Sequence, residues 1–130
     1  MSQKMRHVAL AIATALLLAA CTTKPIYTVT EAPVQANKPN PSLEEVGKAI
    51  VRAGATLGWQ MTPDRPGHVL GRLALRDHVA AVDIDYNERT YNIKYKESTN
   101  LNYGGTMIHR NYNGWIQNLD KAIRAQLATL

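Results

Sequence analysis

Apolar residues recur every third or fourth position along one stretch of the chain, as they do on the buried face of an α-helix. Ser42 stands just before this stretch and Glu45 follows three residues later, which is the capping-box arrangement. Gly58 provides a stop, and Gly47 and Gly54 leave room for close packing against a sheet. The pattern therefore predicts a first helix with an apolar stripe formed by Leu43, Val46, Ala49, Ile50, Ala53 and Leu57.

Residues after this helix alternate between apolar and polar, which is the period of a half-buried β-strand. Turn-forming residues separate the alternating runs. Antiparallel sheets commonly have one covered face and one solvated face, and such alternation is typical of them. We therefore expect a four-stranded antiparallel meander, with strands at residues 59–62, 69–76, 80–86 and 91–96.

Charges on the polar face indicate the register of the last three strands. If Asp77 and His78 form the turn of one hairpin, Arg72 lies opposite Asp83. If the next polar turn closes the following hairpin, Lys94 also lies opposite Asp83. Opposite charges on neighbouring strands stabilise a sheet. The pattern predicts a row of alternating charge across the solvated face.

Helical spacing returns from Tyr112 to the end of the chain. Asp120 and Arg124 lie four residues apart with the acid first, which predicts an exposed ion pair. The expected fold class is α+β: a helix, a four-stranded antiparallel meander and a C-terminal helix. Both helices have one apolar stripe, so we place both on one face of the sheet.

Residues 1–20 have the three-part layout of a secretory signal peptide. Lys4 and Arg6 precede an uncharged apolar run, and small residues follow it. The apolar stretch at residues 8–20 is short of the roughly 20 residues that a membrane-spanning helix needs. The segment therefore indicates export rather than a permanent transmembrane anchor.

The run Leu18-Ala19-Ala20-Cys21 resembles the lipobox of bacterial lipoproteins. The resemblance implies that the signal is cut before Cys21, whose sulfur receives a diacylglyceryl group and whose new amino terminus is acylated. The alternative is an ordinary signal peptide with a chance or buried cysteine. Thr22, rather than an aspartate, follows the cysteine, which in enterobacterial lipoproteins implies the periplasmic face of the outer membrane instead of the inner membrane.

Prolines and polar residues dominate residues 22–41, with no helical period. This composition predicts a linker that is partly polyproline-like. Twenty such residues would reach roughly 25 Å as a flexible coil and about 60 Å when extended. The expected organisation is a signal peptide at residues 1–20, a lipidated cysteine and tether at residues 21–41, and one small domain at residues 42–130.

The formal net charge of +5, from 15 basic and 10 acidic side chains, is compatible with nucleic-acid binding. Residues 42–130, however, carry 11 basic and nine acidic side chains, and an exported protein does not meet nucleic acid. We therefore expect no nucleic-acid partner. The single cysteine also excludes an intramolecular disulfide and a CxxC site.

The least regular part of the domain is residues 96–115, which is rich in polar and aromatic side chains. Long ordered loops often carry function. Aromatic faces and amides also suit contacts with a peptide, a glycan or another polar ligand. The candidate binding residues are Ser98, Asn100, Tyr103, His109, Tyr112 and Asn113.

Two motifs in this part resemble a recurrent domain of small proteobacterial lipoproteins. The first is Y-x-I-x-Y-x-x-S-x-N-L-x-Y from Tyr91 to Tyr103, and the second is I-H-x-x-Y-N-x-W from Ile108 to Trp115. Arg110 stands where proline often follows the histidine of that family. No activity is established for the family, so the resemblance implies a fold, a compartment and a candidate surface, not a reaction.

Catalytic and metal-binding alternatives have weaker support in the sequence. His109 could act as a base or a pH-sensitive contact, or it could cap the last helix. Ser98, His109 and either Asp83 or Asp85 could be combined into a triad, but their spacing matches no known motif. Asp83 and Asp85 could hold a cation or act as an acid/base pair, but the expected partners Arg72 and Lys94 favour a surface charge ladder. We expect no metal and no cofactor.

Two functions remain open. The favoured one is a lipid-anchored periplasmic module that binds an envelope protein, a peptide or a glycan without catalysis. The alternative is a small periplasmic hydrolase that uses His109 and its loop neighbours.

Overall fold

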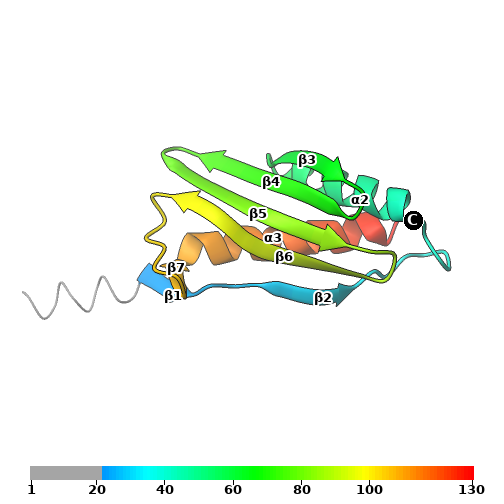
Figure 1. The fold of residues 1–130 in the computed structure, drawn as a ribbon, viewed down its shortest axis with the longest axis horizontal. Coiled ribbons are helices and arrows are strands. Elements are labelled where there is room, and N and C mark those ends of the chain that lie inside the picture. The colour runs from blue at the N-terminus through cyan, green and yellow to red at the C-terminus, as the bar shows by residue number, and fades with distance from the viewer. Residues whose placement is uncertain (1–21) are drawn as a thin grey trace, which may run out of the picture.

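A computed structural model describes residues 22–130, so the signal segment and Cys21 lie outside the described residues. The described chain is an α+β domain with two helices and an antiparallel five-stranded sheet (Figure 1). The helices are α2 (Leu43–Thr56) and α3 (Arg110–Leu127). The strand order is β2 (Val29–Pro33), β6 (Thr90–Thr99), β5 (His78–Tyr86), β4 (His68–Leu75) and β3 (Gln60–Arg65).

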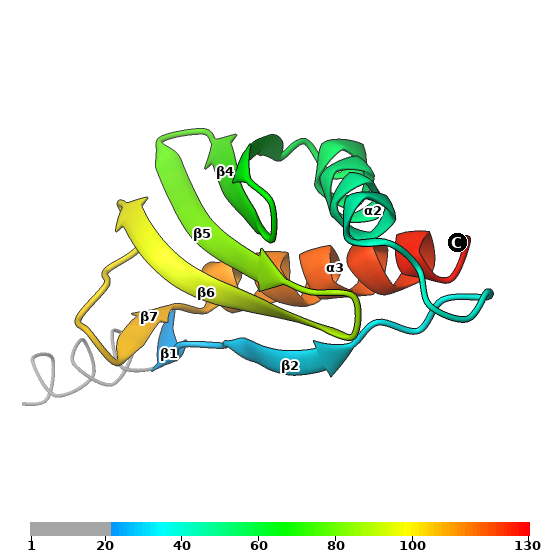
Figure 2. The same ribbon diagram turned by 45° about the vertical axis from the view of Figure 1, so that its right-hand side comes forward.

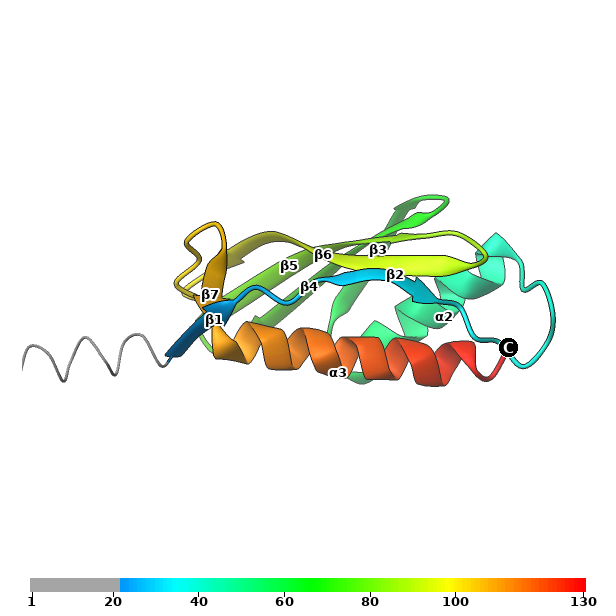
Figure 3. The ribbon, with the colours of Figure 1, turned by 90° about the horizontal axis from the view of Figure 1, so that it is seen from below.

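Both helices cover one face of the sheet, as the apolar stripes predict (Figure 3). Within the described residues no element covers the other face, so the polar positions of the strands remain open there (Figures 1 and 3). The two helices also meet each other, and Arg52 on α2 donates to the side chain of Gln126 on α3 at 3.2 Å. The expected meander is present as β3 to β6, but the sheet contains a fifth strand that the pattern does not predict.

The fifth strand comes from the segment expected to be a tether. β2 pairs antiparallel with β6, and it buries Val29 and Ala32 in the core. Further upstream, β1 (Thr23–Pro25) pairs with β7 (Met107–His109) in a second, two-stranded sheet (Figure 2). Without β2, β6 would be an exposed edge with unpaired N–H and C=O groups. The prediction that residues 21–41 form a tether is therefore wrong for its first part, because most of residues 22–34 belong to the folded domain.

The first helix forms as the sequence predicts. The Ser42 hydroxyl accepts from the Glu45 backbone N–H at 3.1 Å, and the Glu45 carboxylate accepts from the Ser42 N–H at 3.1 Å. Gly58 follows the helix with a φ of +83°, a conformation that glycine adopts without strain. Gly47 faces the Tyr86 ring and Gly54 faces Met61 so closely that no side chain would fit without a shift.

The register confirms one strand pair and corrects the other. Asp83 lies opposite Lys94, as expected. Arg72, however, lies opposite Ala81, so the charge row ends at Asp83. The cause is the hairpin turn, which closes at Arg76 and Asp77 instead of one residue later; Arg76 takes the left-handed φ of +56° that such two-residue turns require. The shift is two residues, so each side chain keeps its predicted face.

The last helix begins at Arg110, two residues earlier than its apolar stripe indicates. Asp120 is buried at 5% exposure, although the sequence predicts an exposed ion pair. It accepts the Tyr91 hydroxyl and binds the Arg124 guanidinium at 3.0 Å. Burial, reinforced by the hydrogen bond to Asp120, raises the pKa of Tyr91, so its hydroxyl stays protonated as a donor.

Candidate functional site

Three of the six candidate residues gather around Tyr95 on β6. The Tyr95 ring stacks on Tyr103 with centroids 4.0 Å apart, and it meets Tyr112 edge-on at 5.7 Å. Its hydroxyl shares a 2.8 Å hydrogen bond with the Ser98 hydroxyl. Tyr103 is 46% exposed, whereas Tyr112 is fully buried. Tyr103 is the most exposed ring of this aromatic cluster, and Tyr95 is half-buried.

The Tyr112 hydroxyl is buried and has no hydrogen-bond partner among the residues that the structure describes. Burial raises the pKa of this hydroxyl, so it remains neutral. Leaving a buried hydroxyl unpaired costs about 1–3 kcal/mol. The side chain is therefore held for the packing of its ring.

Asn113 ties the first strand to the last helix. Its Oδ1 accepts from the Tyr27 backbone N–H at 2.9 Å, and its Nδ2 donates to the Pro25 carbonyl at 2.9 Å. The oxygen and the nitrogen of this side-chain amide thus both make contacts within the fold. The sequence gives no local signal for this structural role, because the partners of Asn113 lie more than 80 positions away. Asn113 was therefore predicted as a ligand-binding residue.

His109 and Asn100 also stabilise backbone. His109 is the N-cap of α3, and its Nδ1 accepts from the Asn111 N–H at 3.1 Å. Asn100 adopts a left-handed φ of +57°, and its Nδ2 donates to the Asp77 carbonyl at 2.8 Å. Of the two roles open for His109, the helix cap matches the observed contact.

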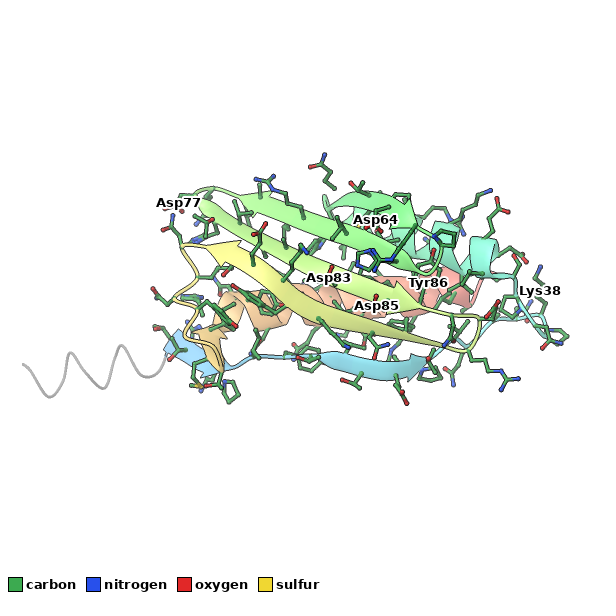
Figure 4. The ribbon with its side chains drawn as sticks, viewed as in Figure 1. Lys38, Asp64, Asp77, Asp83, Asp85 and Tyr86 are labelled. Atoms are coloured by element: carbon green, nitrogen blue, oxygen red, sulfur yellow. The ribbon has the colours of Figure 1, made fainter. Side chains whose placement is uncertain are left out.

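A buried histidine that the sequence did not single out lies on the open face of the sheet. His68 is 5% exposed. Its Nδ1 lies 2.5 Å from Asp64 on β3, and its Nε2 lies 2.8 Å from Asp83 on β5. Figure 4 shows Asp64 and Asp83 on this face. The alternation does place His68 and Asp83 on one face, but Asp64 reaches it only through the β3–β4 pairing.

The two contacts of His68 require a charged ring. A neutral imidazole donates through one nitrogen only, so it cannot donate to two carboxylates at once. Burial alone would lower the pKa of His68, but the hydrogen bonds to Asp64 and Asp83 outweigh it and raise that pKa. The hydrogen bond from His68 in turn lowers the pKa of Asp64. Lys96 adds a further positive charge 3.7 Å from Asp83.

The described residues form neither a metal-binding cluster nor the catalytic triad considered from the sequence. No group of three or more His, Cys, Asp or Glu side chains there has a metal-binding arrangement. Ser98 bonds to Tyr95 and not to His109, and Asp83 bonds to His68.

Two hollows lie away from the predicted candidate residues. The first, of about 820 Å³, is a groove lined by α2, the β3–β4 hairpin and Tyr86 of β5. Its walls include Leu43, Val51, Pro63 and Pro66. Four of its charged lining residues form ion pairs, Lys48 with Glu44 at 2.8 Å and Arg65 with Asp64 at 3.1 Å. The second hollow, of about 810 Å³, is formed by residues 34–36 and 38–42 together with residues 88–89.

Comparisons of the chain with protein-family models, curated proteins and solved structures found no match. Across residues 22–130, neither helix is long and apolar enough to cross a membrane.

Proposed function

We propose that this chain is a lipid-anchored binding module of the bacterial cell envelope, held through Cys21 at the periplasmic face of the outer membrane. The observation that carries the proposal is the run Leu18-Ala19-Ala20-Cys21 at the end of a signal-type segment. The only cysteine of the chain stands at the one position where a lipobox needs a thiol. Several acyl chains on one residue give stable anchoring, because each buried CH₂ contributes about 0.8 kcal/mol.

Contacts of the candidate polar residues support binding over hydrolysis. A general base must present a free lone pair to the proton it removes. The Nδ1 lone pair of His109 already accepts the Asn111 N–H, and the Ser98 hydroxyl is bonded to Tyr95. The side chains that the hydrolase alternative requires are therefore engaged in local structure. The partner classes that remain are the membrane itself and an envelope protein, peptide or glycan.

Metabolic labelling with an alkyne fatty acid tests the anchor. We expect the full-length protein to be labelled and to sediment with outer membranes, and Cys21→Ser to lose both properties. Thr22→Asp is a matched control for sorting between the two membranes. It leaves the thiol intact and is expected to shift the labelled protein toward the inner membrane. Labelling that persists in Cys21→Ser would overturn the anchor.

Two substitutions at one position separate binding from catalysis. Asparagine is also a good N-cap, so His109→Asn keeps a cap and removes the imidazole. We expect His109→Asn to keep the stability of the wild type, whereas His109→Ala loses about 1 kcal/mol of unfolding free energy. Cross-linking in intact cells is expected to give a discrete adduct that persists in His109→Asn. Hydrolysis of ester, amide or glycoside substrates that disappears in both variants would establish the alternative function.

A further inference from the structure

The chain enters the fold at one end of the elongated domain. β1 begins at Thr23, and it is fixed there by pairing with β7, where Lys24 lies opposite Ile108 and Pro25 opposite Met107. Cys21 precedes Thr23 by two residues, and two residues span at most about 7 Å. A lipid on Cys21 would therefore hold the β1–β7 end of the domain beside the headgroups, not at the end of a long tether.

A loop with exposed apolar side chains lies at this same end. Residues 102–107 are all exposed, and they include Tyr103 and Met107, which are 46% and 38% exposed. The Gly104 N–H donates to the Met107 carbonyl at 2.9 Å, and the Ile26 N–H donates to the Thr106 carbonyl at 3.0 Å. The loop is thus fastened directly to the strand that follows Cys21. Tyrosine is enriched where proteins meet the membrane interface, because its ring is apolar and its hydroxyl is polar.

Charges at this end are mostly positive. Lys24 on β1, Arg76 at the tip of the β4–β5 hairpin and Arg110 at the start of α3 are all exposed. Asp77, next to Arg76 in the hairpin turn, and Glu97, close to the end of β6, are acidic residues in this region, and the Asn100 side chain donates to the Asp77 carbonyl. Basic side chains near a bilayer are attracted to anionic headgroups.

We propose that β1, residues 102–107 and the neighbouring Arg76 and Arg110 form a surface that rests on the phospholipid headgroups. This inference depends on the proposed anchor at Cys21. It assigns Tyr103, the exposed member of the aromatic cluster, to the membrane instead of to a soluble ligand. The opposite end of the molecule, with the β5–β6 turn and residues 36–40, then points away from the bilayer (Figure 1).

Spin labels on the lipidated full-length protein test this orientation. Acylation consumes the only native thiol, so Met107→Cys and Glu88→Cys each provide one free site. The protein is reconstituted in vesicles of phosphatidylethanolamine and phosphatidylglycerol. We expect the label at position 107 to be severalfold less accessible to a water-soluble nickel complex than the same label in detergent, and more accessible to oxygen. The label at position 88, on the exposed β5–β6 turn, is expected to remain fully accessible to nickel.

Flotation of the same vesicles separates failure of the anchor from failure of the surface. If the protein does not float with the vesicles, both the anchor and the membrane-facing surface are wrong. If it floats and both labels are equally accessible to nickel, the anchor stands and the surface is wrong. The double variant Tyr103→Ser and Thr106→Glu, in the Met107→Cys background, is expected to float and to lose protection of the label. Leu57→Ser, another exposed apolar position, is the matched control and should change neither result.

Discussion

His68 makes its neighbourhood sensitive to pH in a direction that its contacts determine. Both ring nitrogens face carboxylates, so the charged imidazolium is the form that the folded state favours. The ordinary pKa of histidine, 6.5, is raised in the folded protein. A raised folded pKa means that the stabilisation is fully present below about pH 6.5 and is lost as the pH rises through the folded value. The positive charge of Arg65 disfavours the charged form of His68, and Arg65 bonds to Asp64 at 3.1 Å.

Replacing His68 with Asn should therefore reduce stability more at pH 6 than at pH 9. The measurement is the free energy of unfolding in urea at several pH values, for the wild type and for His68→Asn. We expect the difference between the two proteins to shrink as the pH rises above about 6.5. Asp83→Asn, which removes one carboxylate partner, should flatten the same pH dependence. A difference that is constant from pH 6 to pH 9 would show that His68 contributes by packing alone.

Among the secondary-structure elements, those with strong local signals were predicted and those that depend on distant partners were not. α2 follows from its capping box, and the β5–β6 register follows from Asp83 and Lys94. β2 has no such signal, because a bulge between Val29 and Ala32 breaks its alternation and the flanking prolines favour a linker. Its place in the sheet is set by the edge of β6.

The same reasoning explains what was missed at the candidate site. The structure brings Ser98, Tyr103 and Tyr112 together around Tyr95, while their role in binding stays a prediction. The roles of their neighbours depend on contacts that no short motif encodes, as when Asn113 bonds to the backbone of Pro25 and Tyr27. A polar residue in a long loop is therefore as compatible with holding the loop as with holding a ligand.

The strand β2 can be tested against the tether with two neighbouring substitutions. Val29 is 6% exposed and lies opposite Ile93, whereas Thr30 is exposed. Val29→Asp would bury a charge without a partner and lose apolar burial, so we expect a loss of more than about 2 kcal/mol of unfolding free energy. Thr30→Asp should change it by less than about 0.5 kcal/mol. In a flexible tether the two substitutions would have equal and negligible effects in a urea titration.

Hydrogen bonds join the β1–β7 ribbon to the rest of the described domain. A two-stranded ribbon such as β1–β7 is marginal in isolation. Here it is held by Asn113 on α3 and by the His109 N–H, which donates to the Leu101 carbonyl at 2.8 Å. A membrane-facing surface on this ribbon orients the whole domain only if the ribbon does not open by itself. The ribbon must therefore unfold together with the main sheet.

This requirement leads to a prediction about cooperativity, for which the two tryptophans are suitable probes. Trp59 is 4% exposed and precedes β3, whereas Trp115 lies in the first half of α3 with its ring 6.3 Å from that of His78. In the single-tryptophan variants Trp115→Phe and Trp59→Phe, fluorescence reports the main sheet and the β1–β7 end separately. Each variant has its own stability, so each fluorescence transition is compared with the circular dichroism transition of the same protein. We expect the two transitions to coincide in both variants, as in two-state unfolding. If Trp115 fluorescence changes at a lower urea concentration than the circular dichroism, the β1–β7 end opens independently, and a lipid on Cys21 would hold that end without orienting the rest of the domain.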